Sequence, residues 1–210
     1  MSGPEPGPVG PVGPAGPAAL LAGAIHYALG SVSYVTPRVL TRRTPCAEWD
    51  LSTLLGHVND SLAAFHEGIA RGYVDLEPAG PPRHVPAEED VVTFRARAAR
   101  LLATATATGR EDRPVAIADR RAAGSIVTAV GAVELAVHGW DVAAACGRDR
   151  PIPPGLATAI LEVAPMVVTD ATRQTRFAAP ITVSPGASPS DRLVALLGRN
   201  PHRVFAITPR

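Results

Sequence analysis

Glu134, His138 and Asp141 are the residues of this sequence whose types and spacing best suit chemistry. They lie four and three positions apart in a proline-free run, 124–146, so a helix there would carry them on one face. The apolar residues of the run recur at helical spacing on the same face: Val127, Val130, Val137 and Ala145. Burying two carboxyl groups and an imidazole costs solvation energy. The pattern therefore predicts either a metal ion or a dense hydrogen-bond network.

His57 is the candidate for a third metal ligand. A second helix is expected to begin after Asp50, a good N-cap, and to continue to about Arg71. His57 lies beside the centre of its apolar stripe, among small residues that leave room for a ligand. Two imidazoles and one carboxylate leave coordination positions open, as in catalytic zinc sites. Asp141 would either orient His138 as a hydrogen-bond acceptor or act as a base.

Long amphipathic helices joined by loops predict an all-α fold, a helical bundle. The four expected helices of the bundle cover residues 19–35, 50–71, 88–106 and 124–146. A further helix is expected over 154–172, an extended segment over 177–183 and a short helix over 190–197. The intervening segments, including 72–87 and 107–123, are expected to be loops. Arginines of the second loop either form a solvated turn or hold an anionic substrate or a carboxylate-bearing thiol cofactor: Arg110, Arg113, Arg120 and Arg121.

Composition reduces the number of possible functions further. The 210 residues are 46% hydrophobic with a net charge of +1, which gives no electrostatic footprint for nucleic acid or a membrane surface. No apolar run is expected to span a membrane and no secretory signal is recognised, so the expected location is cytoplasmic. The sequence contains no lysine, which excludes Schiff-base chemistry and a phosphate-binding loop lysine. Cys46 and Cys146 are interpreted as small buried hydrophobic residues rather than reactive thiols.

The chain is expected to have three parts. Residues 1–18 include four consecutive Gly-Pro-X triplets from Gly7, too few for a collagen helix, and are expected to form a disordered tail. Residues 19–176 are expected to form the bundle, and residues 177–210 a C-terminal extension packed on it.

Three stretches of the sequence resemble the DinB-like superfamily, in its actinobacterial branch related to mycothiol-dependent maleylpyruvate isomerase. The second-helix signature is matched by Thr44-Pro45-Cys46, Trp49-Asp50, Leu54-Leu55 and His57-Val58. The fourth-helix signature is matched by Glu134, His138-Gly139-Trp140-Asp141 and Ala143. The C-terminal segment is matched by Pro180-Ile181-Thr182-Val183, Asp191-Arg192-Leu193 and Leu197-Gly198-Arg199-Asn200-Pro201.

The resemblance implies a DinB-like four-helix bundle whose metal ligands are His57, Glu134 and His138. Zinc is the first choice of ion, with nickel or iron as alternatives, and mycothiol is the implied thiol cofactor. The expected function is a metal-dependent isomerase or thiol transferase acting on a small molecule, in a monomer or homodimer. Two alternatives stay open: a thiol-independent metal-assisted isomerase or cyclase of secondary metabolism, and a non-catalytic small-molecule or metal-binding module. An interaction protein that docks through its apolar helices is a third and weaker alternative.

Overall fold

The structure is a computed structural model that describes residues 16–46, 49–75, 87–107, 113–169, 173 and 177–202. Most of the tail predicted to be disordered, residues 1–15, lies outside these ranges, as does Arg110. The helical bundle predicted from the sequence is confirmed. Its four long helices are α1 (Pro17–Val32), α2 (Leu51–Arg71), α3 (Ala87–Ala105) and α4 (Gly124–Ala145).

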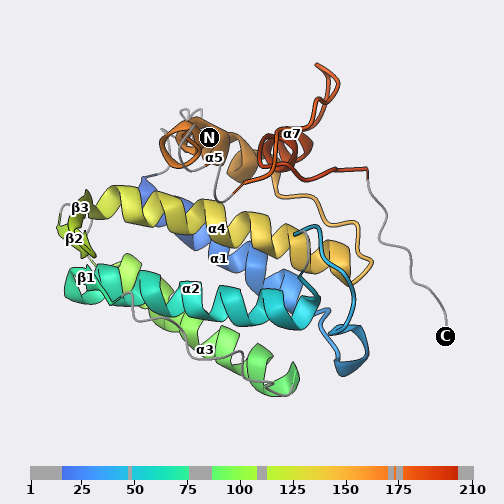
Figure 1. Cartoon of the computed structure of the whole chain (residues 1–210). Coiled ribbons are helices and arrows are strands. Elements are labelled where there is room, and N and C mark those ends of the chain that lie inside the picture. The colour runs from blue at the N-terminus through green and yellow to red at the C-terminus, as the bar shows by residue number, and fades with distance from the viewer. Residues whose placement is uncertain are drawn as a thin grey trace, which may run out of the picture.

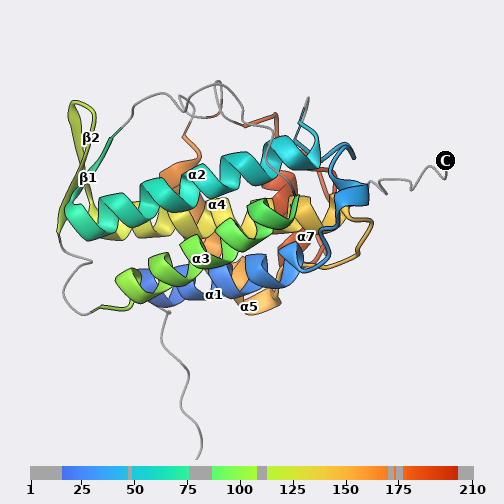
Figure 2. The ribbon, with the colours of Figure 1, turned by 90° about the horizontal axis from the view of Figure 1, so that it is seen from below.

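The four helices form a closed ring of contacts. Helix α1 packs most extensively against α4, α2 packs against α3 and α4, and α3 completes the ring against α1. Figure 1 shows α4 and α2 running side by side for most of their length. Figure 2, seen from below, shows α3 and α1 running alongside this pair. The facing surfaces of α2 and α4 are therefore held in a fixed register, and they carry the predicted metal ligands.

Local signals fix both ends of α2. The side chain of Asp50 accepts a hydrogen bond from the Thr53 backbone N–H at 2.8 Å, as predicted for an N-cap. Gly72 ends the helix with a φ of +82°, a left-handed conformation that glycine adopts at little cost. These two ends set which α2 side chains face α4.

Two segments predicted to be loops contain short strands, and this part of the prediction is wrong. Strand β1 (Tyr73–Val74) pairs in parallel with β2 (Pro114–Ile117), which pairs antiparallel with β3 (Arg120–Ala123). The strands are too short for an alternating pattern to show, and the β1–β2 pairing joins residues far apart in sequence. Arg120 and Arg121 consequently lie on a hairpin at the end of the bundle rather than in a loop.

Helix α4 is the core of the fold, since it is buried almost all around. It lies against α1 and α2 and also contacts α5 (Pro154–Val167), which is followed by α7 (Pro189–Leu196). Within the described ranges, α4 is the one helix long and apolar enough to cross a membrane, which the sequence analysis did not expect. Most of its apolar stretch is buried inside the bundle, as in the core helix of a folded domain.

A candidate metal centre between helices α2 and α4

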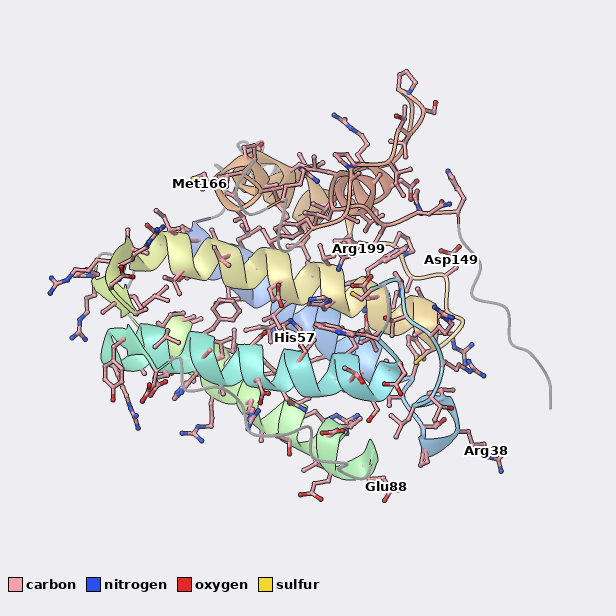
Figure 3. The ribbon with its side chains drawn as sticks, in the orientation of Figure 1. Arg38, His57, Glu88, Asp149, Met166 and Arg199 are labelled. Carbon is pink, nitrogen blue, oxygen red and sulfur yellow. The ribbon has the colours of Figure 1, made fainter. Side chains whose placement is uncertain are left out.

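His57, Glu134 and His138 come together at the interface of α2 and α4. Glu134 and His138 lie one helical turn apart on α4, and the packing of α2 brings His57 opposite them. The Nε2 atom of His57 lies 2.7 Å from Glu134 Oε1, and Nε2 of His138 lies 3.2 Å from the same oxygen. One donor atom from each residue can be chosen so that all three lie within 4.8 Å of one another. Figure 3 shows His57 between the two helices.

This donor set fits a divalent cation. Two imidazole nitrogens and a carboxylate oxygen converge on one point, which leaves coordination positions for a substrate. Burial alone would raise the pKa of Glu134, but His138 and His57 hold it well below its usual range, so the carboxylate is ionised. The Ser61 hydroxyl adds a hydrogen bond to Glu134 Oε1 at 3.4 Å, which helps to orient the carboxylate.

Asp141 occupies the other side of the His138 ring. Its Oδ2 atom lies 2.9 Å from His138 Nδ1, and its side chain is completely buried. Arg199 binds the same carboxylate through Nη2 at 3.0 Å and Nε at 3.4 Å. Burial alone would raise the pKa of Asp141, but the charge of Arg199 and the hydrogen bond from His138 lower it to about 2. The ionised carboxylate accepts the proton of His138 Nδ1 and fixes the ring with its Nε2 atom directed at Glu134.

Cys46 lies with Asp141 and Arg199 on the Nδ1 side of His138. Its Sγ atom donates to Asp141 Oδ2 at 3.2 Å, accepts from Arg199 Nη2 at 3.2 Å and lies 3.8 Å from His138 Nδ1. Burial, together with the charge of Asp141, raises the pKa of this thiol, which keeps it protonated as a donor. Cys46 is partly buried against the hydrophobic core and in addition makes these polar contacts, which the sequence analysis did not predict, whereas Cys146 is buried in the core as expected.

Trp49 forms an aromatic wall beside the two histidines. Its ring centroid lies 4.8 Å from that of His57 and 6.5 Å from that of His138. The segment that carries Trp49 and Cys46 is held against the start of α2 by backbone hydrogen bonds, such as Thr44 N–H to the Trp49 carbonyl. The segment before α2 thus contributes one residue to each side of His138.

The sequence singled out four of the residues in this region and missed three. His57, Glu134, His138 and Asp141 are all brought together, whereas Cys46, Trp49 and Arg199 were given no role in the predicted site. Cys46 and Trp49 belong to the stretch that resembles the family's second helix, and Arg199 to the matching C-terminal stretch, so a signal was present. Figure 3 shows Arg199 reaching α4 from the C-terminal segment.

A pocket of about 590 Å³ opens beside His57 on the outer face of α2. His57 and Ser61 line one end, Arg71 and Val74 line the other, and Arg100 reaches it from α3. Of the four arginines for which a basic rim was the alternative to a solvated turn, Arg113, Arg120 and Arg121 do not line this pocket, and Arg110 lies outside the described residues. Arg113, Arg120 and Arg121 are exposed near the hairpin.

Comparisons with known proteins agree with a DinB-like helical bundle. In fold, the chain is similar to a protein whose crystal structure is described as the mycothiol-dependent maleylpyruvate isomerase, with a TM-score of 0.57 and 16% sequence identity. That match covers 75% of this chain and 70% of the other. A family model described as the mycothiol maleylpyruvate isomerase N-terminal domain matches residues 21–143, more than half of the chain.

The chain therefore belongs to this family, a DinB-like actinobacterial family related to mycothiol-dependent isomerases. Two uncharacterized proteins of Mycobacterium tuberculosis are also similar: MT0763 of strain CDC 1551 / Oshkosh and Rv0738 of strain ATCC 25618 / H37Rv. Each is 28% identical over 160 residues, which covers 74% of this chain and 82% of the relative. Membership in the family implies a small-molecule substrate.

Proposed function

We propose that the protein is a divalent-metal-dependent enzyme that uses a small thiol to isomerise or modify a small electrophilic substrate. The observation that carries the proposal is the convergence of donor atoms from His57, Glu134 and His138 beside an open pocket. These three residues would hold the ion. Zinc suits two imidazoles and one carboxylate, and nickel or iron would accept the same donors.

The exposure of the donors supports a catalytic site. The side chains of His57 and Glu134 are 37% and 25% exposed, whereas that of His138 is 9% exposed. A substrate can therefore reach the site from the side of His57 and Glu134. A bound divalent ion would supply a Lewis acid there, which favours the anionic form of a thiol or polarises a substrate oxygen.

The residues around the three proposed ligands are expected to position His138 and to exclude water. Asp141 is proposed to position His138 rather than to act as a base, because it is buried and already binds Arg199, His138 and Cys46. Trp49 would exclude water from one side of the site.

Mycothiol is the proposed thiol, on the strength of family membership. Its sulfur would add to one carbon of an activated double bond, and elimination after rotation about the resulting single bond would release the isomer and the thiol.

The test measures turnover of maleylpyruvate by the zinc-loaded protein, with and without mycothiol. Turnover that requires both zinc and mycothiol, and is abolished in His138→Ala but kept in His26→Ala, would support the proposal. His26 is exposed on α1 and serves as the matched histidine control. Metal-dependent turnover without a thiol would favour the thiol-independent alternative. Tight binding of small molecules without turnover, unaffected by chelation, would favour a binding module.

A further inference from the structure

Helix α4 lies very close to α1 at Gly139, the residue that directly follows His138. A Cβ atom added to Gly139 would lie 3.1 Å from the Cα atom of Ala28 and 3.1 Å from Cδ1 of Tyr27. The Cα atom belongs to the backbone of a packed helix, so it cannot move aside as the end of a flexible side chain can. The absence of a side chain at Gly139 is therefore what allows this close approach.

Gly56 has the comparable place on α2, directly before His57, but its surroundings differ. Among the described residues, a Cβ atom added to Gly56 would meet no atom within 4 Å beyond its own stretch of helix. The backbone beside His57 is thus free of close contacts, whereas the backbone beside His138 is in contact with a neighbouring helix. The two proposed ligands are therefore held in place in different ways.

Arg150 holds Tyr27 at the contact with Gly139. The Tyr27 hydroxyl donates a hydrogen bond to the backbone carbonyl of Arg150, and the Arg150 guanidinium lies 4.3 Å from the centroid of the Tyr27 ring. Nη1 of Arg150 also donates to the Tyr27 carbonyl and to the Ser31 hydroxyl, each at 2.8 Å. Both the ring and the backbone of Tyr27 are thus bound by one residue.

This residue belongs to the segment that follows α4 in the chain. Arg150 lies between the end of α4 at Ala145 and the start of α5 at Pro154. Helix α4 is therefore held to α1 twice, directly at Gly139 and again through the segment that carries Arg150. A shift of α4 along α1 would have to break both contacts.

The place of α4 decides whether the proposed ligands converge. Glu134 and His138 both belong to α4, so they move together relative to His57 on α2. Helix α4 packs more extensively against α1 than against α2, which means that α1 largely sets its place. A gap of about 10 Å³, lined by apolar side chains, borders His138 and Gly139, so side-chain packing leaves space on this side of the ring.

We propose that Tyr27, held by Arg150, is a positioning residue of the candidate metal centre. It fixes α4 at Gly139 and thereby directs His138 and Glu134 at His57. Tyr27 acts through the backbone of α4 and is not itself a proposed ligand. The inference rests on the proposed function for the metal, whereas the placement of α4 can also be tested in the metal-free protein.

The experiment measures zinc affinity by competition with a chromogenic chelator, together with the visible spectrum of the cobalt-loaded protein. Gly139→Ala should weaken zinc binding by about tenfold or more and change the cobalt bands, as disturbed support of a metal-binding histidine does. Arg150→Met removes the contacts of the guanidinium with Tyr27 but adds no clash. It should weaken zinc binding by a few fold, and it decides the question if Gly139→Ala does not fold.

Two matched controls accompany these variants. Gly56→Ala adds the same methyl group beside the other histidine, where there is space, and should leave zinc affinity and the cobalt spectrum unchanged. Arg148→Met removes an exposed arginine that lies over another tyrosine, Tyr34, at 5.1 Å from the ring centroid. It should also leave the metal site unchanged.

A readout in the metal-free protein reports the placement of α4 against α2. The ring centroids of His57 and His138 lie 5.2 Å apart, so their ring protons should show a nuclear Overhauser effect. This signal should weaken in Gly139→Ala and Arg150→Met and persist in both controls.

The combined results separate a positioning role from a purely structural one. A lower unfolding temperature with wild-type zinc affinity, cobalt spectrum and Overhauser signal would overturn the inference, because the contact would then serve folding alone. If the wild type binds no zinc, the proposed function is contradicted, and the Overhauser signal in the variants still decides whether Tyr27 and Arg150 place His138 opposite His57.

Discussion

The two sides of the His138 ring are built differently. The side of Nε2 is open: it faces Glu134 and His57, whose side chains are 25% and 37% exposed. The side of Nδ1 is closed: it faces Asp141, whose side chain is completely buried and bound by Arg199. The two sides therefore have different roles. The open side offers donor atoms to a ligand, and the closed side fixes the orientation of the His138 ring, which carries one of those donor atoms.

This contrast has an electrostatic counterpart. Two carboxylates, Glu134 and Asp141, lie close to His138. Among the residues that the structure describes, the one permanent cation that contacts them is Arg199, on the closed side. Asp141 is thus compensated by a residue of the chain. For Glu134 the available positive charge is a protonated histidine or a bound cation. Because Glu134 is partly buried and loses solvation energy, such a positive partner stabilises its carboxylate more than it would in water. The open side is therefore the side on which a metal ion would bind.

The largest expected effect follows removal of a donor on the open side. His57→Ala should abolish stoichiometric zinc binding, because a carboxylate and one imidazole would remain. The partly exposed position of His57 means that the metal-free protein should keep its unfolding midpoint. Calorimetric titration with zinc and thermal unfolding in chelator check the two halves of this prediction, and a large loss of metal-free stability would contradict the division of tasks.

The next effect concerns the closed side. Arg199→Met should lower the free energy of unfolding by about 3–5 kcal/mol, because it leaves the Asp141 carboxylate buried without its charged partner. Urea unfolding of the metal-free protein measures this loss. The double variant Arg199→Met/Asp141→Asn should recover part of it, since no unpaired charge remains. The exposed pair of Arg97 and Asp60 is the control, and Asp60→Asn should change stability far less.

Asp141→Asn tests how the closed side acts on the open side. The amide cannot accept from Nδ1 of His138 as strongly as the carboxylate, so the ring loses part of its orientation and basicity. Zinc affinity should fall by about 10- to 100-fold, the usual effect of removing a hydrogen-bond partner from a metal-binding histidine. Unchanged zinc affinity in a folded variant would show that Asp141 serves stability alone.

The smallest effect is expected at Ser61. Its hydroxyl lies 3.4 Å from Glu134 Oε1, a long hydrogen bond on the exposed side of the carboxylate. Ser61→Ala should weaken zinc binding by a few fold, in line with about 0.5–1.5 kcal/mol for one hydrogen bond. Competition with a chromogenic chelator resolves a change of this size. A loss as large as that of His57→Ala would mean that Ser61 is itself a ligand.

The sequence was sufficient to predict the long helices and to identify the candidate residues that share one face of the same helix. Helical spacing placed Glu134, His138 and Asp141 on one face, and the Asp50 cap fixed the start of α2. The pairing of His57 with Glu134 could be inferred only as a candidate, because spacing within a helix says nothing of which helices pack together. The family resemblance supplied the same pairing, and the α2–α4 packing brings the residues together.

The remaining features depend on contacts between distant segments. Arg199 lies 58 positions from Asp141, in a segment with no periodic link to α4, so no local pattern could join them. The strands β1 and β2 pair with each other although α3 lies between them in the sequence, and each is too short to show an alternating pattern. Cys46 looked apolar by type, and its role as a hydrogen-bond donor follows only from its neighbours. These are tertiary features, and they account for the errors of the sequence analysis.

The most direct test of the account is the metal content of the purified protein, measured for the wild type, His57→Ala, His138→Ala and His26→Ala. The account predicts about one divalent ion per chain in the wild type and in His26→Ala, and none in the other two variants. A wild-type protein that carries no ion and takes up none from zinc, nickel or iron would contradict the metal centre. Glu134 and the two histidines would then be a hydrogen-bonded network in the core.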